Sequence, residues 1–216
     1  MPTAHMYCHY PALPATREDL QLPPQFRTTT TGAPFLLIER NEFLVFSTIP
    51  NLRILCEANA VYMDGTFDAV PLLFRQLFTI HAFIQSKRVP LAYCLMMSKT
   101  RDDYVSLLRD LKDLATRNGL NFRPNTISSD FETGLIPAVQ EEFPLAVHRG
   151  CYFHHTQAIF RNIQALGLQQ ACRDDEDIRT QARQLMAIRF VPPHQVRQVF
   201  QKLRRQADAR LVALFD

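Results

Sequence analysis

Two aspartates stand where apolar segments of the sequence are expected to form strands. Asp64 interrupts the run VYMDGTF, and Asp130 closes the run TISSD. A carboxylate on a buried strand is costly unless its charge is compensated. Two carboxylates held a few ångströms apart cannot both stay ionised without a cation. Magnesium would compensate them, because it prefers hard oxygen ligands and is commonly held by one or two carboxylates.

Each aspartate also has an ordinary structural explanation. Asp64 precedes Gly65, and Asp-Gly is a common turn pair. Asp130 could cap a helix that begins near Thr133, because aspartate is a favoured N-cap residue. Either acid taken alone favours these structural roles. The two together, each at its place in one fold, favour a metal site.

The segments around the acids alternate between strand and helix patterns. Strand patterns occur at 61–70, 73–84, 89–97, 124–130 and 145–151, and helical patterns occur at 100–119, 133–144 and 152–167. The order β-β-β-α-β-α-β-α predicts an α/β ribonuclease-H-like fold, in which three antiparallel strands precede parallel additions. In that fold the first and fourth strands are central neighbours, so the two acids would converge.

Composition divides the chain into three regions. Residues 1–34 contain six prolines and the run RTTTTG, which predict an extended lead-in. Residues 35–168 hold the α/β core, which opens with an apolar strand pair at 34–40 and 43–48. Residues 169–216 are expected to be wholly helical, with amphipathic segments at 176–190 and 193–214.

Charge and cysteine content set broad limits. The net charge of +3 is compatible with nucleic-acid binding but does not argue for it. Five scattered cysteines and no secretory leader predict reduced thiols in an intracellular protein. No apolar stretch reaches the roughly 20 residues that span a bilayer, so we expect no membrane segment.

Four motifs, MDGTF, QLFTIHAF, SSDFETG and GCYFHHTQA, occur in this order. Together they resemble the MULE (Mutator-like element) transposase domain, in particular the animal branch often found with FLYWCH-type zinc fingers. The resemblance implies a cut-and-paste DNA transposase with a ribonuclease-H-like core, an Asp-Asp-Glu triad and a two-metal site for Mg²⁺ or Mn²⁺. Asp64 and Asp130 match its first two metal-binding acids, and both would be catalytic.

The third acid of that family is expected on a helix beyond a helical insertion, in a segment like NN-x-x-E-x-x-H. No such segment occurs in this sequence, and 169–216 resembles the start of the insertion. We therefore expect a fragment whose third acid is unknown and which is inactive by itself. Glu176 is the nearest late acid, but it lies in an acidic cluster typical of a surface.

Cys151 and His154 match the C-x2-H motif of the family. A role in the active-site cleft, contacting DNA or orienting Asp130, is the main expectation, with packing and metal binding as alternatives. A tetrahedral zinc site needs four ligands, so we do not expect zinc. Gln157 on the same helix is a candidate DNA contact, and His81 a core or supporting residue. The cluster His5, Cys8 and His9 is attributed to chance.

Three functions remain open from the sequence. The first is a MULE-type transposase acting in the nucleus on transposon ends and target DNA, with homo-oligomers as a further expectation. The second is an inactive, domesticated domain that binds DNA or protein. The third is a domain organised by a structural metal at Cys151 and His154.

Overall fold

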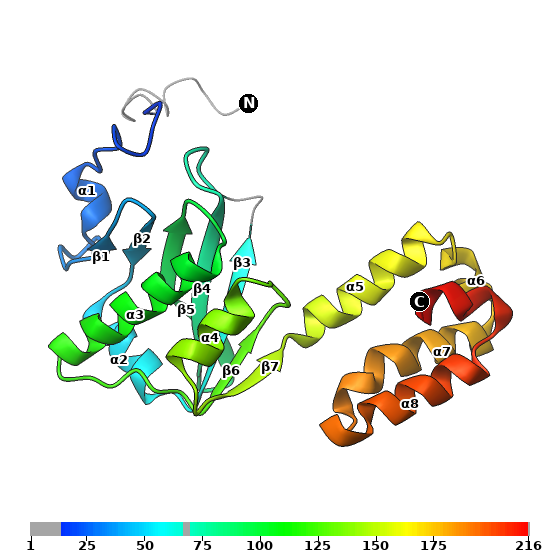
Figure 1. Ribbon diagram of the computed structural model, residues 1–216. Coiled ribbons are helices and arrows are strands. Elements are labelled where there is room, and N and C mark those ends of the chain that lie inside the picture. The colour runs from blue at the N-terminus through cyan, green and yellow to red at the C-terminus, as the bar shows by residue number, and fades with distance from the viewer. Residues whose placement is uncertain (1–13, 67–69, 216) are drawn as a thin grey trace. The chain divides into compact units, whose positions relative to one another are not determined.

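The computed structural model describes residues 14–66 and 70–215 of the 216-residue chain. The cluster His5, Cys8 and His9 therefore lies outside the described residues. The chain forms two compact units, residues 1–149 and 150–216, which are called here the sheet unit and the helical unit (Figure 1). This division follows packing alone, so the expected core at 35–168 and helical insertion at 169–216 stay predictions.

A seven-stranded sheet organises the sheet unit, in the order β1-β2-β5-β4-β3-β6-β7. Strands β1 to β5 run antiparallel to their neighbours, whereas β6 lies parallel to β3. The strands are β1 (Leu36–Glu39), β2 (Phe43–Phe46), β3 (Ala60–Thr66), β4 (Gln76–Ile84), β5 (Lys87–Met96), β6 (Thr126–Ser129) and β7 (Val147–Gly150).

Helices alternate with the later strands, which makes the unit a mixed α/β fold as the sequence predicted. The helices of this unit are α1 (Pro24–Arg27), α2 (Ile49–Glu57), α3 (Arg101–Arg117) and α4 (Leu135–Glu142). Figure 1 shows α3 and α4 in front of the strands, on one side of the sheet. The more specific ribonuclease-H-like assignment stays a prediction at this point.

Local sequence sets the ends of α3. Thr100 and Asp103 form a capping box at its start, in which each side chain bonds the backbone of the other residue. At its end Gly119 adopts a φ of +68°, a left-handed conformation that glycine adopts readily. Between these signals, Leu107, Leu108 and others recur at helical spacing and are fully buried. The helix therefore begins and ends close to where its sequence pattern indicates.

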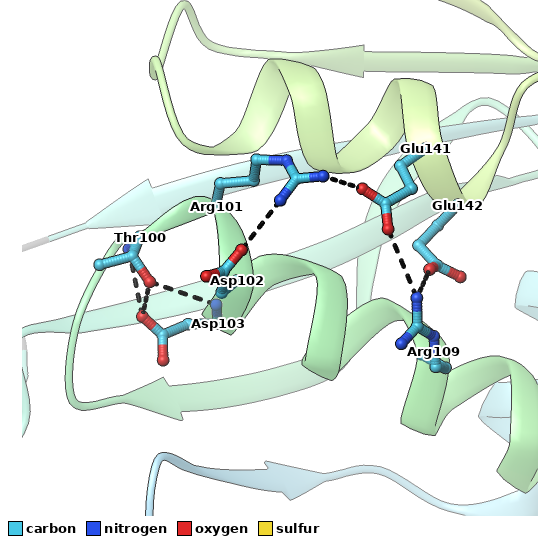
Figure 2. A network of polar contacts seen from close by, with 7 residues as sticks. All are labelled: Thr100, Arg101, Asp102, Asp103, Arg109, Glu141 and Glu142. Atoms are coloured by element: carbon cyan, nitrogen blue, oxygen red, sulfur yellow. Dashed lines mark hydrogen bonds and ion pairs between the residues drawn. The ribbon is translucent and has the colours of Figure 1, made fainter.

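Ion pairs join α3 to α4 on the solvent side (Figure 2). Arg101 pairs with Glu141, and Arg109 reaches both Glu141 and Glu142, the latter at 2.7 Å. Lys112 also contacts the Glu142 carboxylate at 3.0 Å. Glu142 is only 7% exposed, so these cations compensate a buried charge.

The helical unit has its own small core. Its elements are α5 (Tyr152–Ala165), α6 (Gln169–Asp174), α7 (Glu176–Ala187), η2 (Ile188–Phe190), α8 (Pro193–Gln206) and η3 (Ala209–Phe215). The expected helix at 193–214 is thus divided, because Asp208 accepts hydrogen bonds from the backbone and side chain of Arg210 and starts a new turn. Among the residues that the structure describes, no helix is long and apolar enough to cross a membrane.

Candidate active site

Asp64 lies near the end of β3, opposite Thr79 of β4. The Thr79 hydroxyl donates to the Asp64 backbone carbonyl at 3.1 Å. Side chains alternate along a strand, so Asp64 shares a sheet face with Tyr62, whereas Met63 points to the opposite face and is 2% exposed. The face that carries Asp64 is only half-buried, which leaves its carboxylate access to solvent.

Asp130 follows β6 directly, and the strand register relates it to Asp64. β3 and β6 pair in parallel with a constant numbering offset of 66, as in Tyr62 with Ser128. The paired residues end at Tyr62 and Ser128, and Asp64 and Asp130 each lie two positions further along the chain. The pairing of their strands supports the expected convergence, and the approach of the two carboxylates stays a prediction.

Hydrogen bonds around Asp130 fix the chain that carries it. The Glu132 backbone N–H donates to Asp130 Oδ1 at 3.4 Å. The Ser129 hydroxyl donates to the Asp130 carbonyl at 2.9 Å and lies 2.8 Å from His148 Nε2. Burial lowers the pKa of His148, so the neutral imidazole is favoured beside this segment. Asp130 itself is 9% exposed.

His81 lies on β4, opposite Tyr62, and therefore shares the sheet face of Asp64. Its Nε2 is 2.8 Å from the Thr79 hydroxyl, which in turn contacts the Asp64 backbone. Burial and the nearby charge of Arg88 lower the pKa of His81, against a smaller opposing effect of the Asp64 charge. These contacts fit the supporting role that the sequence suggested for His81.

A second cluster of polar residues lies near the ends of β3 and β6. Glu132 Oε1 accepts from Lys99 Nζ at 2.9 Å, and its second oxygen accepts from the Tyr104 hydroxyl. Gln76 Nε2 donates to the same Tyr104 hydroxyl at 2.7 Å. Burial and the bond to Glu132 raise the pKa of Tyr104, so the phenol stays protonated and can donate.

Two glycines permit the close approaches in this region. A Cβ on Gly65, next to Asp64, would lie 2.8 Å from the Gln76 side-chain oxygen. A Cβ on Gly134 would lie 2.4 Å from the Lys99 backbone carbonyl. Side chains at either position would push these segments apart. The glycines of MDGTF and SSDFETG therefore serve packing around the two aspartates.

Cys151, His154 and Gln157 belong to the helical unit. Cys151 is the N-cap residue of α5 and makes no side-chain capping bond. His154 and Gln157 follow at intervals of three residues, so the three side chains fall on neighbouring parts of the helix surface, and all are half-buried. Their expected role in the cleft stays a prediction.

The donor groups suit a hard divalent cation. Asp64 and Asp130, near the ends of neighbouring strands, carry the carboxylate oxygens that Mg²⁺ takes together with water. Within residues 14–66 and 70–215, no group of three or more His, Cys, Asp or Glu side chains is placed to hold a metal. A magnesium or manganese site at Asp64 and Asp130, completed by water and phosphate oxygens, stays a prediction.

The fold and the paired acids define an α/β domain with two aspartates at the ends of adjacent central strands. Residues 60–158 match the family model of the MULE transposase domain, which confirms the resemblance over this segment. The matched segment contains all four motifs from which the resemblance was inferred. No match to the chain was found among curated proteins.

The sequence did not indicate several residues that surround the site. Gln76 and Tyr104 are both fully buried, and Lys99 stands in a loop. Glu132 stands two residues after Asp130 in the motif SSDFETG. Gly134 in the same motif was the one sequence signal for these contacts, because a glycine can mark a place where two backbone segments approach closely.

Proposed function

We propose that the chain contains the catalytic core of a DNA transposase, with a ribonuclease-H-like fold and a divalent-metal site at Asp64 and Asp130. The observation that supports this proposal is the parallel pairing of β3 with β6, the two strands that lead to Asp64 and Asp130. The MULE match supports the assignment to transposition. The strand order β5-β4-β3-β6-β7, with β6 parallel to β3, supports the fold.

The two aspartates would hold the ion, and their strands would orient it toward the phosphate backbone of DNA. A bound magnesium or manganese ion would polarise the phosphate and activate the attacking water or 3′-hydroxyl. Asp64 sits on a rigid central strand, and Asp130 is held through its oxygen by the Glu132 N–H. The chemistry would be hydrolysis followed by transesterification of phosphodiesters.

DNA binding has separate support in the charge distribution. Residues 150–216 contain ten basic and six acidic residues, whereas residues 1–149 contain 14 basic and 15 acidic ones. The positive charge of the chain is thus concentrated in the helical unit, where arginines would contact phosphates without sequence specificity. Cys151, His154 and Gln157 would contact DNA from the same unit. Nuclear location and assembly into oligomers on transposon ends complete the proposal.

One observation favours the alternative of an inactive DNA-binding domain. Over the described part of the chain, no third carboxylate joins Asp64 and Asp130 in a metal-binding group. Efficient strand transfer in such enzymes depends on tight positioning of the reacting groups. A domesticated domain would keep the fold and the affinity for DNA without this chemistry.

A plasmid-nicking assay in Mn²⁺ separates the two functions. The wild-type chain would be compared with the double variant Asp64→Asn, Asp130→Asn, which preserves side-chain size. Nicking by the wild type alone supports the catalytic core. Equal background activity of both proteins, with unchanged DNA binding, would favour the inactive domain instead.

A further inference from the structure

The Glu132 carboxylate is held by two partners from different elements. Lys99, in the connection between β5 and α3, donates to one oxygen at 2.9 Å, and Tyr104 of α3 donates to the other. The Glu132 side chain is 18% exposed and that of Lys99 30%, so the pair is largely shielded from water. An ion pair in such surroundings is weakly screened and fixes both partners.

The contacts continue from Glu132 into the centre of the sheet. The Tyr104 hydroxyl accepts from Gln76 Nε2 at 2.7 Å, and Gln76 and Tyr104 are both 0% exposed. Among the described residues, Gln76 Oε1 has no hydrogen-bond partner. It lies 2.8 Å from the position of a Cβ on Gly65, and Glu132 Oε1 lies 3.9 Å from the same point. The polar cluster thus abuts the residue next to Asp64.

The same cluster is linked to Asp130 through the backbone. Glu132 donates its N–H to Asp130 Oδ1 at 3.4 Å. Two residues later, Gly134 approaches the Lys99 carbonyl so closely that a Cβ there would stand 2.4 Å from it. A shift of the Glu132 side chain would therefore displace the segment that orients the Asp130 carboxylate.

We propose that Glu132 is a positioning residue for the metal site, and that Lys99, Tyr104 and Gln76 hold it in place. The proposal rests on the metal site of the proposed function and extends it. Both oxygens of Glu132 accept hydrogen bonds, which fixes the orientation of its carboxylate.

The test is the affinity of the whole chain for Mn²⁺, followed by the water-proton relaxation of the bound ion. Residues that support metal ligands typically contribute 10- to 100-fold to metal affinity. We expect Glu132→Ala to weaken Mn²⁺ binding about tenfold or more. Glu132→Gln should weaken it less, because the amide oxygen still accepts from Tyr104 while the bond to Lys99 is lost.

Glu141→Gln is the matched control. It removes the same charge from the same layer of the unit, at an exposed ion pair with Arg101 (Figure 2). Its Mn²⁺ affinity should equal that of the wild type. If Glu132→Ala fails to fold, Glu132→Gln with an unchanged melting temperature decides the question. Equal weakening by Glu132→Gln and Glu141→Gln would contradict positioning, because loss of charge alone would explain it.

Asp130→Asn in the same titration separates this inference from the proposed function. If Asp130→Asn abolishes Mn²⁺ binding while both Glu132 variants bind like the wild type, the metal site stands and the inference is overturned. If the wild type binds no Mn²⁺, or Asp64→Asn and Asp130→Asn bind it unchanged, the metal site itself is wrong and the inference falls with it.

Discussion

The sheet unit and the helical unit differ most in the size of their cores. In the described residues, one cluster of 26 buried side chains joins the sheet to α2, α3 and α4, whereas the helical unit buries a cluster of seven. Burial of apolar surface is the main source of stability, and it grows with unit size. The unit with the large core is also the one that contains the costly buried groups, Gln76, Asp130 and Glu142. The buried polar groups, which reduce stability, thus lie in the unit whose larger core supplies more of it.

The largest expected effects come from removing one core side chain in each unit. Leu107→Ala and Ile178→Ala should each cost about 3 kcal/mol, because both side chains are fully buried. The sheet unit should remain folded after Leu107→Ala. The 67-residue helical unit should unfold, because cores of this size rarely supply more than about 3–5 kcal/mol.

Hydrogen exchange resolved along the chain checks this pair of variants. Ile178→Ala should remove protection from 150–216 and leave β3 and β4 protected. Loss of protection throughout the chain in Ile178→Ala would show that the two units fold together. Their stabilities would then not be independent.

A smaller effect is expected from Gly65→Ala in the sheet unit. The added methyl group would lie 2.8 Å from the oxygen of the fully buried Gln76, which has little room to move. Overpacking of this kind costs about 2 kcal/mol. Gly119→Ala is the control, since nothing lies within 4 Å of its Cβ position and only backbone strain is added. In urea unfolding both variants should be destabilised, but Gly65→Ala alone should weaken Mn²⁺ binding.

Glu142→Gln tests the buried charge of the sheet unit through pH. Burial alone raises the pKa of Glu142, but hydrogen bonds from Lys112 and Arg109 outweigh it and hold the pKa below its ordinary value. The stabilisation is therefore present above the ordinary carboxyl pKa and is lost as the pH falls through the lowered one. At neutral pH the variant should lose about 1–2 kcal/mol. Unfolding curves of the two proteins should converge in acid; a constant difference would contradict this origin.

The smallest effect should follow Arg210→Gln in the helical unit. Arg210 contacts Asp175 at 2.8 Å and Asp208 at 2.9 Å on the surface. Its hydrogen bonds lower the pKa of Asp208 to about 2, so the contribution exists above the ordinary carboxyl pKa and fades as the pH falls toward that value. The fall in melting temperature should be smaller than for Glu142→Gln. It should become smaller still in 1 M salt, where the screening length of about 3 Å is close to the contact distances.

Much of the sheet unit could be predicted from local patterns. The strand patterns at 73–84 and 89–97 left four residues between them for a turn, and the chain does turn there, with Gln85 at a φ of 57°. The spacing of leucines and the end signals of α3 gave its bounds to within a residue or two. These features depend on neighbours in sequence, which is why a single sequence reveals them.

The candidate site was predictable only in part. Strand order placed Asp64 and Asp130 on neighbouring strands, and β3 does pair with β6. The contacts of Glu132 could not be predicted, because Lys99, Tyr104 and Gln76 come from three separate elements whose approach depends on packing. A strand pattern indicates that Gln76 faces the core, but not that a tyrosine hydroxyl meets it there.

The constant register of β3 and β6 limits where the chain can change its length. Residues added to or removed from the connections between the two strands leave the pairing, and so the placement of both aspartates, unaltered. One residue inserted within the four-residue β6 would rotate Asp130 to the opposite face of the sheet. Length variation among functional copies of this domain is therefore expected in loops and helical segments, and single-residue insertions ahead of either aspartate should mark copies that have lost the site.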